Sequence, residues 1–181
     1  RMGTDKGALN YHGKSQIAYL YELLSKVTDQ TFVSCRADQT TSEHIKNYRT
    51  IEDRFLDFGP TGGILSAFHK YPYASWMVVA CDMPFINLET ITDLLNNRNP
   101  YRLATCFYNG EKKWPGPLCA IYEPKAMLKL GHYLSIGKPC PRKVLMNSRI
   151  QCLDLNNQNA LNNINTPSEF KENFNRINGN M

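Results

Sequence analysis

Residues 76–84 read WMVVACDMP, and this stretch decides the fold. The continuous apolar run from Trp76 to Cys81 predicts a β-strand buried on both faces. Strands of parallel sheets have this character because helices cover both sides of such sheets. Asp82 follows the run directly, at the carboxyl end where open parallel sheets bind their ligands. The stretch therefore predicts an α/β fold with a carboxylate at its ligand-binding edge.

Helix-like and strand-like segments alternate on both sides of this strand. Apolar runs predict strands at residues 31–35, 48–52, 76–81, 102–108, 118–122 and 150–155. Helical spacing and capping residues predict helices at residues 15–27, 41–47, 64–70, 88–96, 125–134 and 141–146, and a last helix that Thr166 caps and Pro167 opens. The alternation predicts a three-layer α/β/α, Rossmann-like fold with a mostly parallel sheet, in a single domain over residues 1–181.

The composition excludes several classes of protein. The chain has 181 residues, 42% hydrophobic and 20% charged, which is ordinary for a globular domain. No apolar run approaches the roughly 20 residues that cross a bilayer. The net charge of +5 is scattered and accompanies no nucleic-acid-binding motif, so we expect anionic small ligands such as phosphates, with no nucleic acid and no membrane as partners. We expect a monomer or a weak homo-oligomer.

The cysteines and histidines show neither a disulfide framework nor a zinc site. The six cysteines form no Cys-x-x-Cys pair, and most of them lie in or beside apolar runs, as small core residues do. The four histidines lack metal-ligand spacing. This pattern favours a reducing compartment, so we expect a cytoplasmic protein.

Two glycine-containing segments are candidates for binding phosphates. Arg1 and Lys6 flank Gly3 and can place two cations on one polyphosphate, although basic loop residues usually serve only as solvated surface. Residues 59–63 read GPTGG ahead of a predicted helix, and small residues there allow the backbone to approach an anionic ligand at the helix N-terminus. An ordinary loop is the alternative interpretation of this segment.

Two polar segments are candidates for metal and ligand contacts. Asp82 can hold Mg²⁺, a hard cation that prefers oxygen ligands and bridges to substrate phosphates; its alternative role is to cap the end of the strand. Residues 163–167 read NINTP, which is a helix-start signal in any case. The amide side chains of Asn163 and Asn165 can also hydrogen-bond a ligand.

The order of these segments resembles the bacterial molybdenum cofactor guanylyltransferases. The motifs that carry the resemblance are RMGTDK at 1–6, IED at 51–53, GPTGG at 59–63, CDMP at 81–84, PLCA at 117–120 and NINTP at 163–167. Single motifs are shared with other nucleotidyltransferases, whereas the ordered set is specific. The resemblance runs from Arg1 to about Phe174.

The resemblance implies transfer of GMP from GTP to the phosphate of molybdopterin, with release of pyrophosphate. It implies Mg²⁺ as cofactor, and molybdoenzymes or other cofactor-biosynthesis proteins as further partners. The implied catalytic residues are Asp82, which also binds the metal, with Lys6 and Arg1 on the phosphates. The implied nucleotide contacts are Lys6, Asp53, Gly59, Gly62, Gly63 and Asp82, and the implied pterin contacts are Asn163 and Asn165.

The sequence departs from the family pattern at one point. The family opens with a β-strand and a Leu-Ala-Gly-Gly loop before its Arg-Met-Gly, and both are absent ahead of Arg1. Without its central strand a sheet would leave backbone groups unpaired. We therefore expect further residues upstream of Arg1 in the polypeptide.

Other functions remain open at this point. A cytidylyltransferase acting on molybdopterin or on another phosphate acceptor would use the same chemistry. A non-catalytic cofactor-binding module is favoured by the absent Gly-rich loop and disfavoured by Lys6 and Asp82. A dinucleotide-dependent oxidoreductase is disfavoured because no Gly-x-Gly-x-x-Gly opens a βαβ unit.

Overall fold

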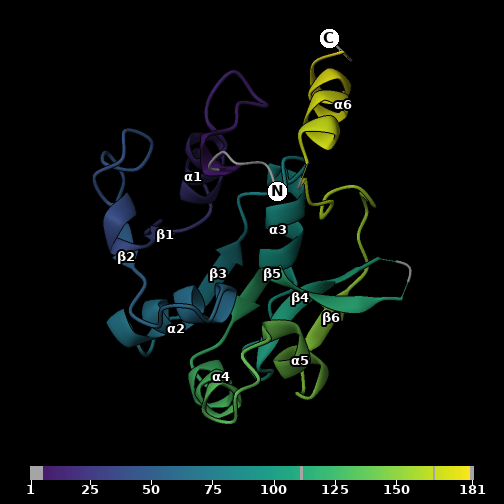
Figure 1. Cartoon of the computed structure of the whole chain (residues 1–181). Coiled ribbons are helices and arrows are strands. Elements are labelled where there is room, and N and C mark those ends of the chain that lie inside the picture. Colours follow the sequence, from purple (N-terminus) through teal and green to yellow (C-terminus); the bar gives the residue numbers. More distant parts are fainter. Residues whose placement is uncertain (1–5, 111, 165, 180–181) are drawn as a thin grey trace.

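The computed structural model describes residues 6–110, 112–164 and 166–179 (Figure 1). The strands are β1 (Val33–Cys35), β2 (Thr50–Glu52), β3 (Trp76–Val79), β4 (Ala104–Asn109), β5 (Trp114–Tyr122) and β6 (Gln151–Leu153). The α-helices are α1 (Gln16–Ser25), α2 (Pro60–Lys70), α3 (Leu88–Asn96), α4 (Ala126–Ser135), α5 (Pro141–Met146) and α6 (Pro167–Asn178), and two 3-10 turns are η1 (Lys6–Ala8) and η2 (Ala37–Gln39).

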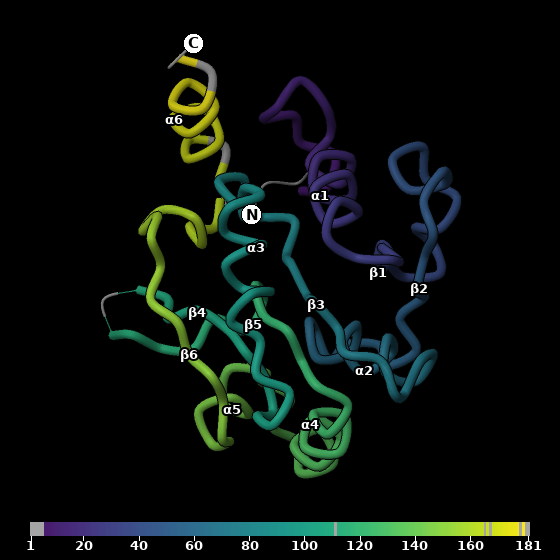
Figure 2. Tube along the Cα trace, turned by 180° about the vertical axis from the view of Figure 1, so that it is seen from behind, coloured from purple at the N-terminus to yellow at the C-terminus, as the bar shows by residue number. Residues whose placement is uncertain are grey.

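The strands form two separate sheets. β1 and β2 pair in parallel, and the larger sheet has the order β3-β5-β4-β6. In the larger sheet β5 runs antiparallel to both of its neighbours, while β4 and β6 are parallel. The predicted α/β class is confirmed, with a larger sheet that is mixed. Figures 1 and 2 show β1 and β2 on the side of the molecule away from β4 and β6.

Helices cover both faces of the larger sheet and so produce the predicted three layers. One hydrophobic cluster packs α2, α4 and α5 against the side chains of Ala104, Cys106, Ala120 and Tyr122. The other packs α1 and α3 against the opposite face, where Phe107, Cys119 and Ile121 point. Adjacent residues of one strand belong to opposite clusters because successive side chains of a β-strand alternate between its faces.

The strand that suggested a parallel sheet pairs differently from the expectation. β3 is antiparallel to β5, with Trp76 opposite Tyr122 and Val79 opposite Cys119. Trp76 and Val78 contact one core cluster and Met77 and Val79 the other, so its side chains do pack on both faces. The apolar run correctly predicts that β3 packs on both faces. It does not predict the direction of the partner strand, because burial on both faces is possible with either direction.

Helix α2 begins at Pro60, four residues before the predicted start. Gly59 precedes it with a φ of 54°, a left-handed conformation that favours glycine, and Pro60 occupies the first turn, where its missing N–H is not needed. Gly62 and Gly63 therefore lie inside the helix, and the prediction of a glycine-rich turn over residues 59–63 was wrong beyond Gly59.

The helix predicted over residues 41–47 was also wrong. This segment forms turns, with isolated hydrogen bonds such as Ile45 N to Ser42 O and Tyr48 N to Ile45 O. Only the 3-10 turn η2 (Ala37–Gln39) precedes it. A short segment does not gain enough consecutive hydrogen bonds to offset the cost of helix nucleation.

The strand β5 starts at Trp114, four residues before its predicted start, and includes two prolines. Pro115 lies opposite Tyr108, after an irregularity in the register between Cys106 and Tyr108. Residues 114–117 of β5 have no register partner in β3, and Leu118 O accepts from Ala80 N just beyond β3, so residues 114–117 lie at a sheet edge among the described residues. Proline is tolerated at edges and bulges because a missing N–H there breaks no essential ladder bond.

The two predicted helix caps are confirmed. Asn87 caps α3 and Thr166 caps α6, where Thr166 and Glu169 bond reciprocally in a capping box.

All six cysteines are free thiols, and Cys106 and Cys152 face each other on β4 and β6 with their sulfurs 3.4 Å apart. No helix in the described part of the chain has the length and apolarity needed to cross a membrane.

Candidate active site

Lys6 and Asp82 meet at the carboxyl end of β3. Lys6 begins η1, Asp82 follows β3, and Lys6 Nζ donates to Asp82 Oδ2 over 3.1 Å. The second oxygen, Asp82 Oδ1, is buried and has no hydrogen-bond partner among the described residues. Burying a carboxylate oxygen without a hydrogen-bond donor costs free energy. Asp82 Oδ1 therefore marks a place where a cation or a hydrogen-bond donor can bind.

A buried phenol adds to the electrostatics of this corner. Tyr11 is almost completely buried, and burial raises its pKa to about 12, with further contributions from the negative charges of Asp82, Cys81 and Glu169. The phenol therefore stays protonated at neutral pH beside the carboxylate. Its ring packs on Phe170 of α6, with centroids 4.9 Å apart. Tyr11 therefore joins α6 to the residues around Asp82.

The donor set at Asp82 fits Mg²⁺ that arrives together with a polyphosphate. In residues 6–110, 112–164 and 166–179 no group of three or more His, Cys, Asp or Glu side chains could hold a metal by itself. Mg²⁺ usually takes one or two carboxylates and completes its coordination with water and substrate phosphates. Asp82, with its open Oδ1, would be one such carboxylate ligand, and the ammonium of Lys6, 3.1 Å from Oδ2, would be a positive charge for phosphate oxygens.

A second polar cluster lies at the carboxyl ends of β1 and β2. Asp53 follows β2, and its Oδ1 accepts a hydrogen bond of 2.7 Å from the hydroxyl of Ser34 in β1. A Cβ atom at Gly63 would lie 2.7 Å from Ser34 Oγ and 3.4 Å from Asp53 Oδ1. The glycine thus lets the first turn of α2 approach the two polar side chains closely.

Gly62 and Gly59 have different roles from Gly63. A Cβ atom at Gly62 would come within 2.1 Å of the carbonyl oxygen of Phe55, so glycine there permits close packing of α2 on the preceding loop. At Gly59 a Cβ atom would meet nothing within 4 Å, and the requirement is the positive φ. Among the three predicted glycines, only Gly63 adjoins the Ser34–Asp53 pair directly.

A cavity of about 370 Å³ lies between the two polar clusters. Gly7 and Cys81, the neighbours of Lys6 and Asp82, line one part of it, and Ser34 lines another. Leu20, Leu24 and Ile45 are among the apolar residues of its wall. The structure therefore brings Lys6 and Asp82 together. Asp53 and Gly63 do not line this cavity themselves, but their neighbour Ser34 does.

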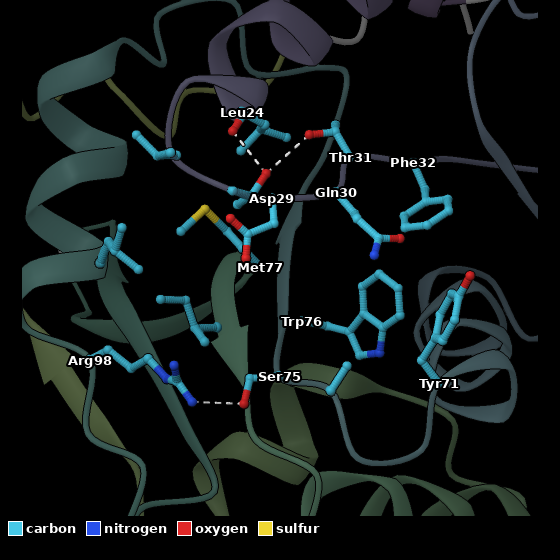
Figure 3. A pocket seen from close by; sticks show the side chains of 15 residues that line it. Leu24, Asp29, Gln30, Thr31, Phe32, Tyr71, Ser75, Trp76, Met77 and Arg98 are labelled. Carbon is cyan, nitrogen blue, oxygen red and sulfur yellow. Dashed lines mark hydrogen bonds between the residues drawn. The ribbon is translucent and has the colours of Figure 1, made fainter.

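The cavity continues along β3 as a groove between β1 and β3. Adjoining cavities of about 160 Å³ and 450 Å³ share lining residues with it, and we call this continuous feature the β1–β3 groove, defined by Leu24, Phe32, Trp76, Met77 and Val79. Figure 3 shows the cavity of about 450 Å³, where Trp76 lies near Gln30 and Tyr71, and Arg98 donates to the hydroxyl of Ser75. Among the described residues, β3 pairs only with β5 and β1 only with β2, so both strands present open backbone edges.

The segment with the predicted pterin contacts is anchored directly to Asp82. The backbone N–H of Ile164 donates to the carbonyl of Asp82 over 2.9 Å, and the neighbouring Asn163 is exposed. Asn163 therefore lies in the chain next to a residue that bonds to the Asp82 backbone. Arg1 and Asn165, the other predicted contacts, lie outside the described residues.

Sequence reasoning missed Ser34. Its hydroxyl lies in the short apolar segment 31–35, where a serine gives no signal of a ligand-facing role. Its position next to Asp53 depends on the parallel pairing of β1 with β2, in which Ser34 faces Ile51 and Cys35 faces Glu52. The available signal was that strand 31–35 and the segment Ile51–Glu52–Asp53 would end at the same sheet edge.

Comparison with known families identifies the class of protein that this fold and site define. The family model of the MobA-like NTP transferase domain matches residues 1–150. The chain belongs to this family, whose name describes transferases of nucleoside triphosphates.

Two relatives carry more specific names. The chain is 35% identical over 170 residues to the "Molybdenum cofactor biosynthesis bifunctional protein" of Synechocystis sp., a match over 94% of this chain and 49% of that protein. It is 31% identical over 171 residues to the "Molybdenum cofactor guanylyltransferase" of Pseudomonas paraeruginosa, a match over 91% of this chain and 83% of the relative. The chain thus spans about half of the Synechocystis relative and most of the Pseudomonas one.

Solved structures with low sequence identity share the fold. Molybdopterin-guanine dinucleotide biosynthesis protein A from Archaeoglobus fulgidus superposes with a TM-score of 0.80 at 24% identity, over 99% of this chain and 93% of that one. CMP:2-keto-3-deoxy-manno-octonic acid synthetase in complex with CTP superposes with a TM-score of 0.75 at 13% identity, over 97% and 92% of the two chains. Both likenesses establish the nucleotidyltransferase fold.

Proposed function

We propose that this chain carries the activity of a molybdenum cofactor guanylyltransferase, which transfers GMP from GTP to the terminal phosphate of molybdopterin. The observation that carries the proposal is the Lys6–Asp82 pair, whose open Oδ1 and adjacent ammonium suit a metal-bound triphosphate. Membership of the MobA-like family and the names of the relatives support the choice of reaction.

The proposed reaction needs positioning and charge neutralisation more than proton transfer. An oxygen of the acceptor phosphate bonds to the α-phosphorus of GTP while the bond from that phosphorus to the bridging oxygen breaks, and pyrophosphate leaves with the electron pair. The attacking phosphate is already ionised at neutral pH, so no side chain has to remove a proton from it. In this proposal Lys6 binds phosphate oxygens, and Asp82 would hold a metal ion next to them. A magnesium ion held by Asp82 would supply positive charge that offsets the charge of the triphosphate.

We assign the remaining predicted residues to the two ends of the substrate pair. Asp53 and Gly63 adjoin Ser34, which lines the 370 Å³ cavity together with Cys81, the neighbour of Asp82, and we assign them to the guanosine. Asn163 lies on the segment tied to the Asp82 backbone, which suits it to the pterin. Arg1 and Asn165 keep their proposed roles on the phosphates and the pterin. The free thiols suit a reducing cytoplasm, where molybdoenzymes or other cofactor-biosynthesis proteins would be partners.

Turnover with each of the four nucleoside triphosphates tests the proposal. Purified protein is mixed with molybdopterin, Mg²⁺ and one triphosphate, and pyrophosphate and the dinucleotide product are quantified. We expect the fastest reaction with GTP and loss of the reaction when Mg²⁺ is chelated. A faster reaction with CTP would identify a cytidylyltransferase. Binding of GTP without any pyrophosphate release would identify a binding module.

We also propose that the β1–β3 groove takes an additional β-strand, which would join the two sheets into one. The groove is flanked by the open edges of β1 and β3 and walled by apolar side chains of α1 and α2 such as Leu24 and Ile64. Lys6 lies at the carboxyl end of β3, so a strand running parallel to β3 would leave the groove next to it. Such a strand would supply backbone partners to both edges.

A further inference from the structure

The loop that follows Asp82 is held by an unusual concentration of bonds to its carbonyl groups. Gln16 Nε2 donates to Met83 O over 3.3 Å, His12 Nε2 to Pro84 O over 2.9 Å, and the hydroxyl of Tyr19 to Ile86 O over 2.9 Å. The carbonyl of Asp82 itself accepts from the Ile164 backbone. Four of the five carbonyl groups of residues 82–86 are thus held by donors from elsewhere in the chain.

The three side-chain donors come from one short segment that also carries Lys6. The segment from η1 to α1 turns back on itself, with a β-bridge between Asn10 and Ser15 and a bond of 2.8 Å from Gln16 N to Leu9 O. The rings of His12 and Tyr19 stack with centroids 3.8 Å apart, which holds their two donors side by side. One compact unit therefore presents Lys6 at its start and three loop-binding donors after it.

Burial makes these bonds restrictive. Gln16 is completely buried, and Met83, Pro84 and Ile86 are buried as well. The bond from Gln16 is buried, and those from His12 and Tyr19 are partly buried, so little water competes with these donors for the carbonyls that they contact. A movement of the loop relative to Lys6 would leave buried carbonyls without donors.

The geometry points to His12, Gln16 and Tyr19 as positioning residues that set Asp82 opposite Lys6 in the active site. The inference rests on the proposed function, because Asp82 and Lys6 matter together only where a metal-bound triphosphate lies between them. We assign these three residues no contact with the reacting atoms. They hold the backbone from which the Asp82 carboxylate projects, as outer-shell residues hold metal ligands elsewhere.

Three substitutions test the inference against a matched control. Gln16→Met and Tyr19→Phe remove one donor each with little change of shape, and His12→Phe removes a donor while keeping a ring to stack. The control is Tyr122→Phe, which deletes a buried phenol bonded to Pro117 O over 2.8 Å in the larger sheet, away from the Asp82 loop. Both tyrosine variants lose one hydroxyl-to-carbonyl bond.

Two measurements are made on each variant: backbone hydrogen exchange of residues 82–87, and the Mg²⁺ concentration that gives half-maximal binding of GTP or half-maximal turnover. For Gln16→Met we expect faster loop exchange and an increase in the Mg²⁺ requirement of about 10-fold. Tyr122→Phe should change melting temperature without changing either quantity. His12→Gln, which keeps an amide donor for Pro84 O, should lie closer to the unsubstituted protein than His12→Phe.

An unchanged Mg²⁺ requirement in folded Gln16→Met and Tyr19→Phe proteins would overturn the inference, as would equal effects in Tyr122→Phe. Loop exchange and Mg²⁺-dependent GTP binding require no turnover. If the unsubstituted protein binds Mg²⁺ and GTP without releasing pyrophosphate, the proposed reaction fails while these two measurements still decide the positioning role.

Discussion

Lys6 Nζ and Asp82 Oδ2 lie 3.1 Å apart although 76 residues separate them in the sequence. The pair joins the start of η1 to the end of β3 and places opposite charges where the strand ends. Only one oxygen of the carboxylate is used, because Oδ1 has no partner among the described residues. The pair can therefore take a further ligand, with the Lys6 ammonium as its positive contact and Asp82 Oδ1 as its oxygen contact.

The first prediction concerns the charge of Asp82. Asp82→Asn keeps the size of the side chain and removes the negative charge that a divalent cation needs. We expect the turnover number to fall by about 100-fold or more, since metal-based charge stabilisation contributes several kcal/mol to phosphoryl transfer. Steady-state kinetics at saturating GTP measure the effect, and circular dichroism confirms folding. Turnover near that of the unsubstituted protein would remove Asp82 from catalysis.

The second prediction concerns the close approach at Gly63. In Gly63→Ala the new methyl group would meet Ser34 Oγ at 2.7 Å and disturb its bond to Asp53. We expect a higher KM for GTP with a smaller change in kcat, because in our proposal the Ser34–Asp53 cluster binds the guanosine, away from the reacting phosphorus. Gly131→Ala is the matched control, since a Cβ atom there meets nothing within 4 Å. Equal KM values for the two variants would contradict the assignment.

The third prediction concerns pH and His12. Burial lowers the pKa of His12 below its ordinary value of 6.5, against a smaller opposing effect of the bond to Pro84 O. The unfolded chain therefore takes up a proton at a higher pH than the folded protein does. The stabilisation from neutral His12 is complete above pH 6.5 and is lost as the pH falls through the folded pKa.

Urea unfolding at pH 7.5 and pH 5.5 measures this contribution. The free energy of unfolding should decrease toward pH 5.5 by more in the unsubstituted protein than in His12→Gln, which has no titrating group at this position. A larger decrease in the variant would contradict the sign of the effect.

The fourth prediction concerns the ion pair of Arg98 and Glu123. Glu123 is only 2% exposed and accepts from Arg98 Nε over 2.8 Å and from Ser75 Oγ over 2.6 Å. Burial acts to raise the pKa of Glu123, but the bonds from Arg98 and Ser75 outweigh it and lower the pKa overall. Arg98→Met would leave the carboxylate buried without its cation. We expect a loss of about 3 kcal/mol in the free energy of unfolding, measured in urea at pH 7.

A control separates this effect from the general removal of a surface charge. Lys113 pairs with Asp154 in an exposed bridge, so Lys113→Met removes a comparable cation from the surface. This variant should leave the free energy of unfolding nearly unchanged, because exposed ion pairs contribute little to stability. Similar losses in the two variants would contradict the special role of the buried carboxylate.

The fifth prediction concerns the β1–β3 groove. Fusion of an apolar, strand-forming segment ahead of Arg1 should slow the backbone hydrogen exchange of β1 and β3 by about 10-fold or more, because their open edges gain partners. The control is the same fusion with proline at alternate positions, which cannot donate to a ladder. No difference between the two fusions would show that the groove does not take a paired strand.

Much of the fold was predictable because caps and apolar runs are local signals. Asn87 and Pro141 mark the starts of α3 and α5, which begin at the predicted residues 88 and 141. The start of α2 was missed because Gly62 and Gly63 are typical of turns. Their presence inside a helix is explained only by the nearby Phe55 carbonyl and Ser34 hydroxyl, which the sequence does not place there.

The site was predictable where residues end strands and less so where they contact backbone. Asp82 and Asp53 follow apolar segments, so their positions at a sheet edge follow from the pattern. Backbone carbonyl groups accept the bonds from His12, Gln16 and Tyr19. Every residue has such a carbonyl, so no pattern of side chains in the sequence predicts these contacts.

Trp76 gives the β1–β3 groove a built-in optical reporter. Its indole lies with its ring centroid 5.8 Å from that of Phe32 and 6.0 Å from that of Tyr71, and its Nε1 has no partner among the described residues. The chain has two tryptophans, and the other, Trp114, is 42% exposed on β5. Replacing Trp114 by Phe leaves Trp76 as the single tryptophan. With selective excitation of tryptophan, occupation of the groove becomes visible as a change in fluorescence wavelength and can be followed in real time.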